Sequence, residues 1–237
     1  MIPAVTKRCS PAGNLPVLPQ MATFLHWIET HASLLNEVLG VLFALIYLWF
    51  SIRQKIWLWP FGILTSFFYI LVFYHSRLYA DMGLQVYYLV VSIYGWYHWL
   101  FGGKGGERDT LPVTRISGNQ LLPLAGITFG IYWILVFLLT WLPRRLGIPA
   151  SQMIYWDAFT TAGSIVATWL LARKKLEQWL IWIVVDLVSM GMYIYKGLYL
   201  TVFLFFVYTT MAVAGYFAWK KELFAEKSIM EPGQGEV

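Results

Sequence analysis

Charged residues and cysteines are both scarce in this chain. Charged side chains make up 12% of its 237 residues, whereas soluble domains carry about 25%. Hydrophobic residues make up 59% of the chain, and its mean hydropathy is +0.62. We therefore expect the lipid bilayer to be its solvent. With Cys9 as its single cysteine, the chain forms no internal disulfide and no cysteine-based zinc site.

Several functional motifs are also missing. The four histidines are scattered without the spacing of metal ligands, and the GGKGG stretch at 102–106 lacks the spacing of a phosphate-binding loop. Basic residues are not interleaved with aromatic ones as in nucleic-acid-binding proteins. Residues 1–20 lack the continuous apolar core of a cleavable signal peptide. We predict no catalytic residues, no metal, no cofactor and no nucleic-acid partner.

The chain aligns with itself at a shift of 120 residues, with no gap between residues 37–99 and 157–219. Most aligned pairs are apolar in both copies, and 11 of the 63 pairs are identical. A repeat of membrane helices is typical of transporters whose substrate lies between the two halves. The identical pairs include rare tryptophans and basic loop residues: Trp49/Trp169, Arg53/Arg173, Lys55/Lys175, Trp59/Trp179, Ile63/Ile183, Leu78/Leu198, Tyr79/Tyr199, Leu84/Leu204, Tyr88/Tyr208, Gly95/Gly215 and Trp99/Trp219.

Seven stretches are long and apolar enough to cross a bilayer, which takes about 20 residues per helix. We predict membrane spans over residues 35–52, 56–75, 79–101, 120–142, 155–172, 178–196 and 198–219. The flanks are predicted to be an N-terminal tail with an interfacial amphipathic segment (1–34) and a disordered polar tail (221–237). Between them we expect a first three-helix repeat (35–101), a loop and linking helix (102–154) and a second repeat (155–220).

The basic residues predict the orientation. If the N-terminus lies outside, the outer segments hold six lysines and arginines and the inner segments hold eleven. The positive-inside rule therefore favours an outer N-terminus and a cytoplasmic C-terminus. Three helices per repeat is an odd number, so a single linking helix is needed to bring the repeated basic motifs to the same side. This predicts an all-α membrane protein with seven helices in a 3+1+3 plan of parallel repeats, as in SWEET-type transporters.

Asp186 lies in the middle of the sixth predicted span, in WLIWIVVDLVSMGMYIY. A carboxylate at that depth costs about 2.5–3.5 kcal/mol on insertion scales, so it should face a cavity or a partner. Trp182 and Ser189 share its helix face, at spacings of four and three residues. We interpret this face as a site for a cationic or hydroxyl-rich ligand; a buried hydrogen bond to a neighbouring helix is the alternative.

Polar residues in two other spans complete the candidate site. Gln85, Tyr88 and Ser92 lie on one helix face of the third span, and Thr65 lies in the middle of the second. They bind a ligand, or they hold neighbouring helices together. Most tryptophans lie near span ends and are expected in interfacial belts: Trp57, Trp59, Trp96, Trp99, Trp179 and Trp219.

Three strings carry a resemblance to a known family: LYADMGLQVYYLVVSIYGWYHW in the third span, YWDAF in the fifth, and WLIWIVVDLVSMGMYIYKGLYLTVFLFFVYTTMAVAGYFAW across the last two. Over about residues 35–220 the chain resembles PnuC-type vitamin transporters, chiefly the nicotinamide riboside carriers. The resemblance implies the seven-helix 3+1+3 bundle and facilitated diffusion, with cytosolic phosphorylation of the vitamin holding the gradient. It also implies a substrate site between the triplets that includes Gln85, Trp182 and Asp186.

The chain departs from that family at the site itself. Nicotinamide riboside carriers have asparagine where this chain has Asp186, and often asparagine where it has Thr65. Related carriers take thiamine or riboflavin, and thiamine, like nicotinamide riboside, combines a cationic ring with a hydroxyl-bearing arm. We therefore expect uptake of nicotinamide riboside, with thiamine or another vitamin precursor as the alternative.

The expected location is a bacterial inner membrane, and the expected partners are a small vitamin, the lipid bilayer and a cytosolic kinase. A homo-oligomer is also compatible with such a bundle. A receptor of seven helices would not need two equivalent halves, and a membrane enzyme would need a nucleophile or metal constellation that the sequence lacks.

Overall fold

A computed structural model describes residues 38–75, 79–102, 111–147 and 149–230. The described chain is helical, apart from a short extended connector before α4. Its elements are an N-terminal helix Val38–Ile52, α2 Leu58–His75, α3 Tyr79–Phe101, α4 Gly118–Leu146, α5 Ile154–Ala172, α6 Gln178–Tyr195 and α7 Tyr199–Met230. These seven helices confirm the predicted all-α architecture. The interfacial segment before residue 35 and Cys9 lie outside the described residues.

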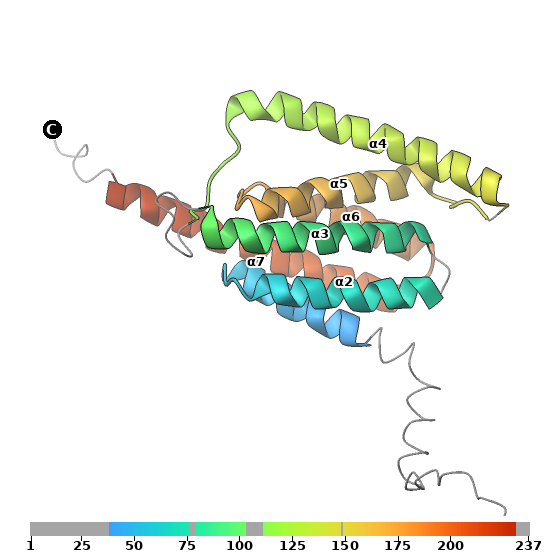
Figure 1. Cartoon of the computed structure of the whole chain (residues 1–237), viewed down its shortest axis with the longest axis horizontal. Helices are drawn as coiled ribbons and strands as arrows, with labels where there is room; N and C mark the ends of the chain where they lie inside the picture. Colours follow the sequence, from blue (N-terminus) through green and yellow to red (C-terminus); the bar gives the residue numbers. More distant parts are fainter. Residues whose placement is uncertain (1–37, 76–78, 103–110, 148, 231–237) are drawn as a thin grey trace, which may run out of the picture.

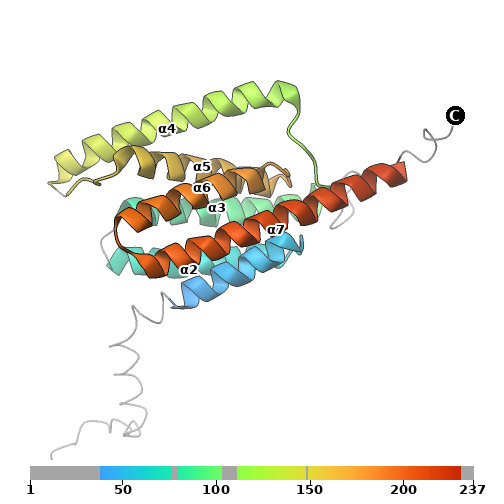
Figure 2. The same cartoon turned by 180° about the vertical axis from the view of Figure 1, so that it is seen from behind.

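Six of the helices form a ring, and α4 packs outside it (Figure 1, Figure 2). Around the ring, α2 contacts α3, α3 contacts α5, and α6 follows between α5 and α7. The helix Val38–Ile52 closes the ring, because Trp219 of α7 donates a hydrogen bond to the Ser51 carbonyl. The linking helix α4 contacts α5 and stands along one edge of the molecule. The repeats thus form the ring, three helices each, and enclose its centre.

Two of the predicted boundaries are wrong. The linking helix extends six residues further than predicted in total, because Gly118 begins it and Arg144 and Arg145 continue its last turn until Gly147 ends it in the left-handed conformation. The tail predicted to be disordered from residue 221 is instead helical as far as Met230. Its Glu222 accepts a hydrogen bond of 2.5 Å from the side chain of Gln54, which ties the start of this extension to the first repeat.

The tryptophan prediction is wrong for four residues. Trp59, Trp99, Trp179 and Trp219 are at most 2% exposed and lie inside the bundle, whereas Trp57 and Trp96 are exposed. The repeat explains the arrangement: the Trp59 and Trp99 rings meet edge to face at 5.4 Å, and Trp179 and Trp219 do so at 5.6 Å. These four residues pack as two equivalent pairs, one from each repeat.

The turns that follow the helix Val38–Ile52 and α5 are also equivalent. Gln54 and Lys174 occupy the same repeat position, and each has a positive φ, of 52° and 48°. Positive φ is uncommon outside glycine, so its recurrence at one position shows that both copies make the same turn. These two turns, together with the buried tryptophans, form what we call the basic end of the bundle, since Arg53, Lys55, Arg173 and Lys175 lie there.

Four helices satisfy length and hydropathy criteria for a membrane span by themselves: α2, α4, α6 and the Tyr199–Ala225 part of α7. The helix Val38–Ile52 is apolar but shorter within the described residues. The ring helices α3 and α5 carry more polar residues, among them Gln85, Ser92, Ser164 and Thr168. Ser92, Ser164 and Thr168 are buried, so these hydroxyl groups belong to the interior of the bundle.

Candidate functional site

The middle of α6 places a carboxylate inside the ring. Asp186 is 5% exposed, and Ser189, one turn further along, is 7% exposed. Among the residues that the structure describes, no lysine or arginine forms an ion pair with Asp186. A buried charge without a partner is costly in a bilayer and marks a functional site by default. Asp186 is therefore the central group of the candidate site.

Two equivalent tyrosines lie near this carboxylate. Tyr88 of α3 and Tyr208 of α7 occupy the same repeat position, and both hydroxyls lie close enough to Asp186 to interact with it electrostatically. The Tyr88 hydroxyl also hydrogen-bonds the side chain of Ser164 in α5. Tyrosine hydroxyls from both repeats therefore share the surroundings of the carboxylate.

The N-terminal helix and α2 complete the polar interior. Tyr47 lies close enough to Tyr88 for their hydroxyls to interact. Its ring packs against Gly62 of α2, where an added Cβ atom would lie 3.0 Å from the Tyr47 ring and 3.1 Å from the Ser92 hydroxyl. The buried Ser66 of α2 occupies the repeat position of Asp186. A hydroxyl in one repeat and a carboxylate in the other make the site chemically asymmetric.

The other predicted residues differ in how well they fit this centre. Gln85 is half-buried on α3, one turn from Tyr88. Trp182 is half-buried on α6, one turn from Asp186, and packs against the buried cluster at the basic end. Thr65 donates its hydroxyl hydrogen to the Phe61 carbonyl at 2.8 Å. Because that hydroxyl already donates a hydrogen bond within α2, Thr65 is the weakest candidate among the predicted substrate-binding residues.

Sequence reasoning missed Tyr47 and Tyr208. Tyr208 carried a usable signal, because Tyr88/Tyr208 is an identical pair of the internal repeat and Tyr88 was already a candidate. No sequence signal marked Tyr47 as a site residue, since its repeat partner is Ala167 and the surrounding sequence is uniformly apolar. Only the packing of the N-terminal helix against α2 brings the Tyr47 hydroxyl into the interior of the ring.

A hollow of about 690 Å³ lies elsewhere, between α4, α5 and α6. Its lining is mostly apolar and includes Leu124, Phe159 and Val185. None of the predicted substrate residues contributes to it. Because α4 stands outside the ring, this hollow is separate from the polar interior.

The polar interior suits a particular class of ligand. Its described groups are a carboxylate, tyrosine and serine hydroxyls and an amide, so it offers hydrogen bonds and one negative charge. A ligand with a cationic ring and hydroxyl groups fits these partners, and the aromatic rings add favourable contact with a flat cation. A phosphate would face the Asp186 carboxyl group without a described cationic partner.

Comparisons with known proteins agree with this architecture. The family model of the nicotinamide mononucleotide transporters matches residues 34–221. The nicotinamide riboside transporter PnuC of Escherichia coli strain K12 is 23% identical over 202 residues, which is 77% of this chain and 84% of that protein. The riboflavin/roseoflavin transporter RibM of Streptomyces davaonensis is 25% identical over 206 residues, covering 82% of this chain and 92% of the relative.

The fold has a counterpart among solved structures. The crystal structure of the vitamin B3 transporter PnuC superposes with a TM-score of 0.56 and 21% identity, covering 87% of each chain. Because the family match spans all seven helices and the relatives are transporters rather than enzymes, we conclude that this chain is a multi-pass inner-membrane transporter of the nicotinamide mononucleotide transporter (PnuC) family.

Proposed function

We propose that the protein takes up nicotinamide riboside by facilitated diffusion. The observation that carries the proposal is Asp186, a carboxylate buried in the middle of α6 without an ion pair among the described residues. The nicotinamide ring of the riboside is cationic, so its charge offsets the cost of the buried carboxylate, and attraction is weakly screened away from water. Trp182 adds a cation–π contact worth about 0.5–2 kcal/mol.

The ribose arm completes the fit. In this proposal Gln85 and the tyrosine hydroxyls bond its hydroxyl groups, and Ser189, buried one turn from Asp186 on α6, adds a further hydroxyl. The free nucleoside suits this site better than the mononucleotide, because the phosphate would face Asp186. Thiamine is the second candidate, since it also has a cationic ring and a hydroxyl-bearing arm, and the acidic residue at 186 favours a cation. Riboflavin, which the name of one relative gives, has a neutral ring that does not need the carboxylate.

The substrate is retained because it is chemically modified in the cytosol after uptake. A facilitator equilibrates its solute across the membrane, so net uptake requires that the solute be changed after entry. Phosphorylation by a cytosolic kinase adds a charged group that the site does not accept. This couples uptake to the kinase without a direct contact between the two proteins.

Binding of a vitamin panel to the purified protein tests the proposal. Nicotinamide riboside and thiamine should bind, and riboflavin should bind weakly. Asp186→Ala should weaken binding of the cationic ligand by about tenfold or more and Trp182→Ala by about two- to thirtyfold, because each removes a contact to the ring. Asp186→Asn should have a modest effect on nicotinamide riboside and a larger one on thiamine.

The matched control is Leu187→Ala. Leu187 is the next residue of α6 and is 50% exposed on the outer side of the helix, so its truncation should leave affinity unchanged. Unaltered affinity in both Asp186→Ala and Trp182→Ala, with both proteins folded, would place the binding site elsewhere. Tight binding of riboflavin with no binding of either cation would reject the proposed substrate class.

A further inference from the structure

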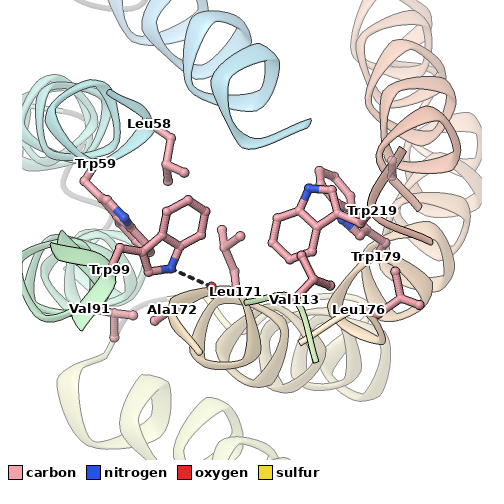
Figure 3. Close-up of a cluster of buried hydrophobic side chains, with 11 residues drawn as sticks. Leu58, Trp59, Val91, Trp99, Val113, Leu171, Ala172, Leu176, Trp179 and Trp219 are labelled. Carbon is pink, nitrogen blue, oxygen red and sulfur yellow. Dashed lines mark hydrogen bonds between the residues drawn. The ribbon is translucent and has the colours of Figure 1, made fainter. Parts of the chain in front are cut away.

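Four tryptophans from four helices close the basic end of the ring. Trp59, Trp99, Trp219 and Trp179 form a continuous row, with ring centroids 5.4, 6.3 and 5.6 Å apart in that order. Figure 3 shows the row with Leu58, Leu171 and the other buried side chains around it. The largest fully buried side chains of the described structure all belong to this end. The row is therefore the most tightly closed part of the bundle.

The tryptophan row lies between the candidate site and the two basic turns that follow the helix Val38–Ile52 and α5. Along α6, residue 186 follows residue 179 by seven positions, which is about 10 Å of helix. Along α3 and α7, Tyr88 and Tyr208 precede Trp99 and Trp219 by the same 11 positions, about 16 Å. A solute that leaves the site toward this end must pass the row.

Two reciprocal hydrogen bonds hold the row in place. The Trp99 indole donates to the Leu171 carbonyl of the second repeat at 3.3 Å, and the Trp219 indole donates to the Ser51 carbonyl of the first at 3.0 Å. The two acceptors occupy the same repeat position, as do the two donors. Each bond crosses from one repeat to the other, so both bonds must break if the repeats separate at this end.

Other polar groups at the same place have no partner. The indole nitrogens of Trp59 and Trp179 and both amide atoms of Gln178 are buried without a hydrogen bond among the described residues. A buried group of this kind loses its bonds to water and regains them when water enters. These groups therefore raise the free energy of the closed state relative to an open one. Gln178 is fully buried, and its repeat partner is the equally buried Leu58.

We propose that the tryptophan row is the gate of the transporter at the basic end, and that Gln178 biases this gate toward opening. The crossed bonds of Trp99 and Trp219 stabilise the closed form, and water reaches the amide of Gln178 when the repeats part. The leucine at position 58 shows that the fold accepts an apolar residue there, so the amide is not required for packing. The proposal requires only that the protein is a transporter, and it does not depend on which vitamin is carried.

Cysteine accessibility tests the gate in the absence of substrate. Ala212 is 2% exposed on α7, between Tyr208 and Trp219, and serves as the reporter in an Ala212→Cys, Cys9→Ser protein. The rate of its reaction with a small water-soluble thiol reagent is measured in proteoliposomes, with the reagent on either side. Trp99→Phe and Trp219→Phe each remove one crossed bond and keep an aromatic side chain, so labelling from the basic end should rise about two- to tenfold. Gln178→Leu should lower it by about tenfold.

The matched control is Trp96→Phe, because Trp96 lies one turn before Trp99 but is exposed outside the row. It should leave the labelling rate unchanged. Gln178→Leu should also slow substrate exchange while equilibrium affinity stays within a factor of two, which a merely misfolded protein would not show. Equal labelling rates in all variants, or faster labelling only from the opposite end, would overturn the proposal. A failure of the vitamin panel would leave these rates unaffected, so the two proposals fail separately.

Discussion

At the scale of single residues, two glycines provide the space into which two rings of the tryptophan row pack. A Cβ atom at Gly95 would lie 2.2 Å from the Trp59 ring, and one at Gly215 would lie 2.6 Å from the Trp179 ring. Cβ atoms do not approach other atoms so closely, so any side chain at either position must displace an indole. These glycines are an identical pair of the repeat, and each receives the tryptophan of its own repeat.

We predict that Gly95→Ala and Gly215→Ala each destabilise the protein by about 1–3 kcal/mol, the usual cost of overpacking a core. Thermal unfolding in detergent measures the change. Gly191→Ala is the control, because an added Cβ at this α6 position meets nothing within 4 Å. It should have no harmful effect and should stabilise the helix slightly. A neutral result at both 95 and 215 would contradict the packing of the row.

The second prediction at this scale concerns the tyrosines of the site. Tyr88→Phe and Tyr208→Phe remove a hydroxyl beside Asp186 and keep the ring. Each should weaken substrate binding by about two- to tenfold, the value of one hydrogen bond. Titration of the purified variants measures the dissociation constant, with Tyr132→Phe in α4 as the control outside the ring. Loss of affinity in Tyr132→Phe, with no loss in the other two, would point away from this site.

At the scale of elements, the connector before α4 fixes the turn between α5 and α6. The Thr114 amide donates to the Lys174 carbonyl, and the Leu176 amide donates to the Thr114 carbonyl, both at 3.0 Å. Glu177 accepts the Ile116 amide at 3.0 Å and pairs with the largely exposed Arg115. The equivalent turn of the first repeat is held instead by Glu222 of α7. Different segments thus stabilise the two equivalent turns.

Glu177→Ala should lower stability by about 1–2 kcal/mol, because the half-buried Ile116 amide loses its acceptor. Arg115→Ala is the control and should cost less than about 1 kcal/mol, since an exposed ion pair contributes little. Thermal unfolding and protease cleavage of the connector report the two effects. If Arg115→Ala proves as harmful as Glu177→Ala, the ion pair rather than the amide bond holds the connector.

At the scale of the whole molecule, the uneven distribution of basic residues predicts the topology. Arg53, Lys55, Arg173 and Lys175 share one end of the bundle, and α7 also ends there. By the positive-inside rule we expect this end, and with it the C-terminus, in the cytoplasm. Reporter fusions to the C-terminus should be active only on the cytoplasmic side. Activity only on the outer side would place the basic end, and with it the proposed gate, on the outer face.

We also predict transport without ion coupling. Asp186 is the acid in the middle of a span, and no second acid of the sequence lies at that depth to form a relay or a sodium site. Proteoliposomes should therefore equilibrate the substrate without concentrating it. Accumulation driven by an imposed proton or sodium gradient would contradict this prediction.

The sequence alone determined the membrane, the repeat and the central carboxylate. Low charge and long apolar stretches require a bilayer, and a gapless repeat of three spans requires a linking helix to keep the basic turns on one side. Asp186 was identifiable because a carboxylate in the middle of a membrane span is costly and therefore marks a functional site. Each of these features can be recognised from residue types and their spacing along the chain, without knowing which helices contact one another.

Only the tertiary structure decided which aromatic residues face inward. Trp59 and Trp57 are two positions apart in the same sequence context, yet the first is fully buried and the second is 61% exposed. Tyr208 comes near the carboxylate, and Tyr47 comes near Tyr88, because helices distant in the chain pack side by side. In a bilayer both the interior and the lipid accept apolar and aromatic side chains, so hydropathy does not separate the two faces. The contacts between helices make that choice, and they depend on residues more than 100 positions apart, such as Trp219 and Ser51.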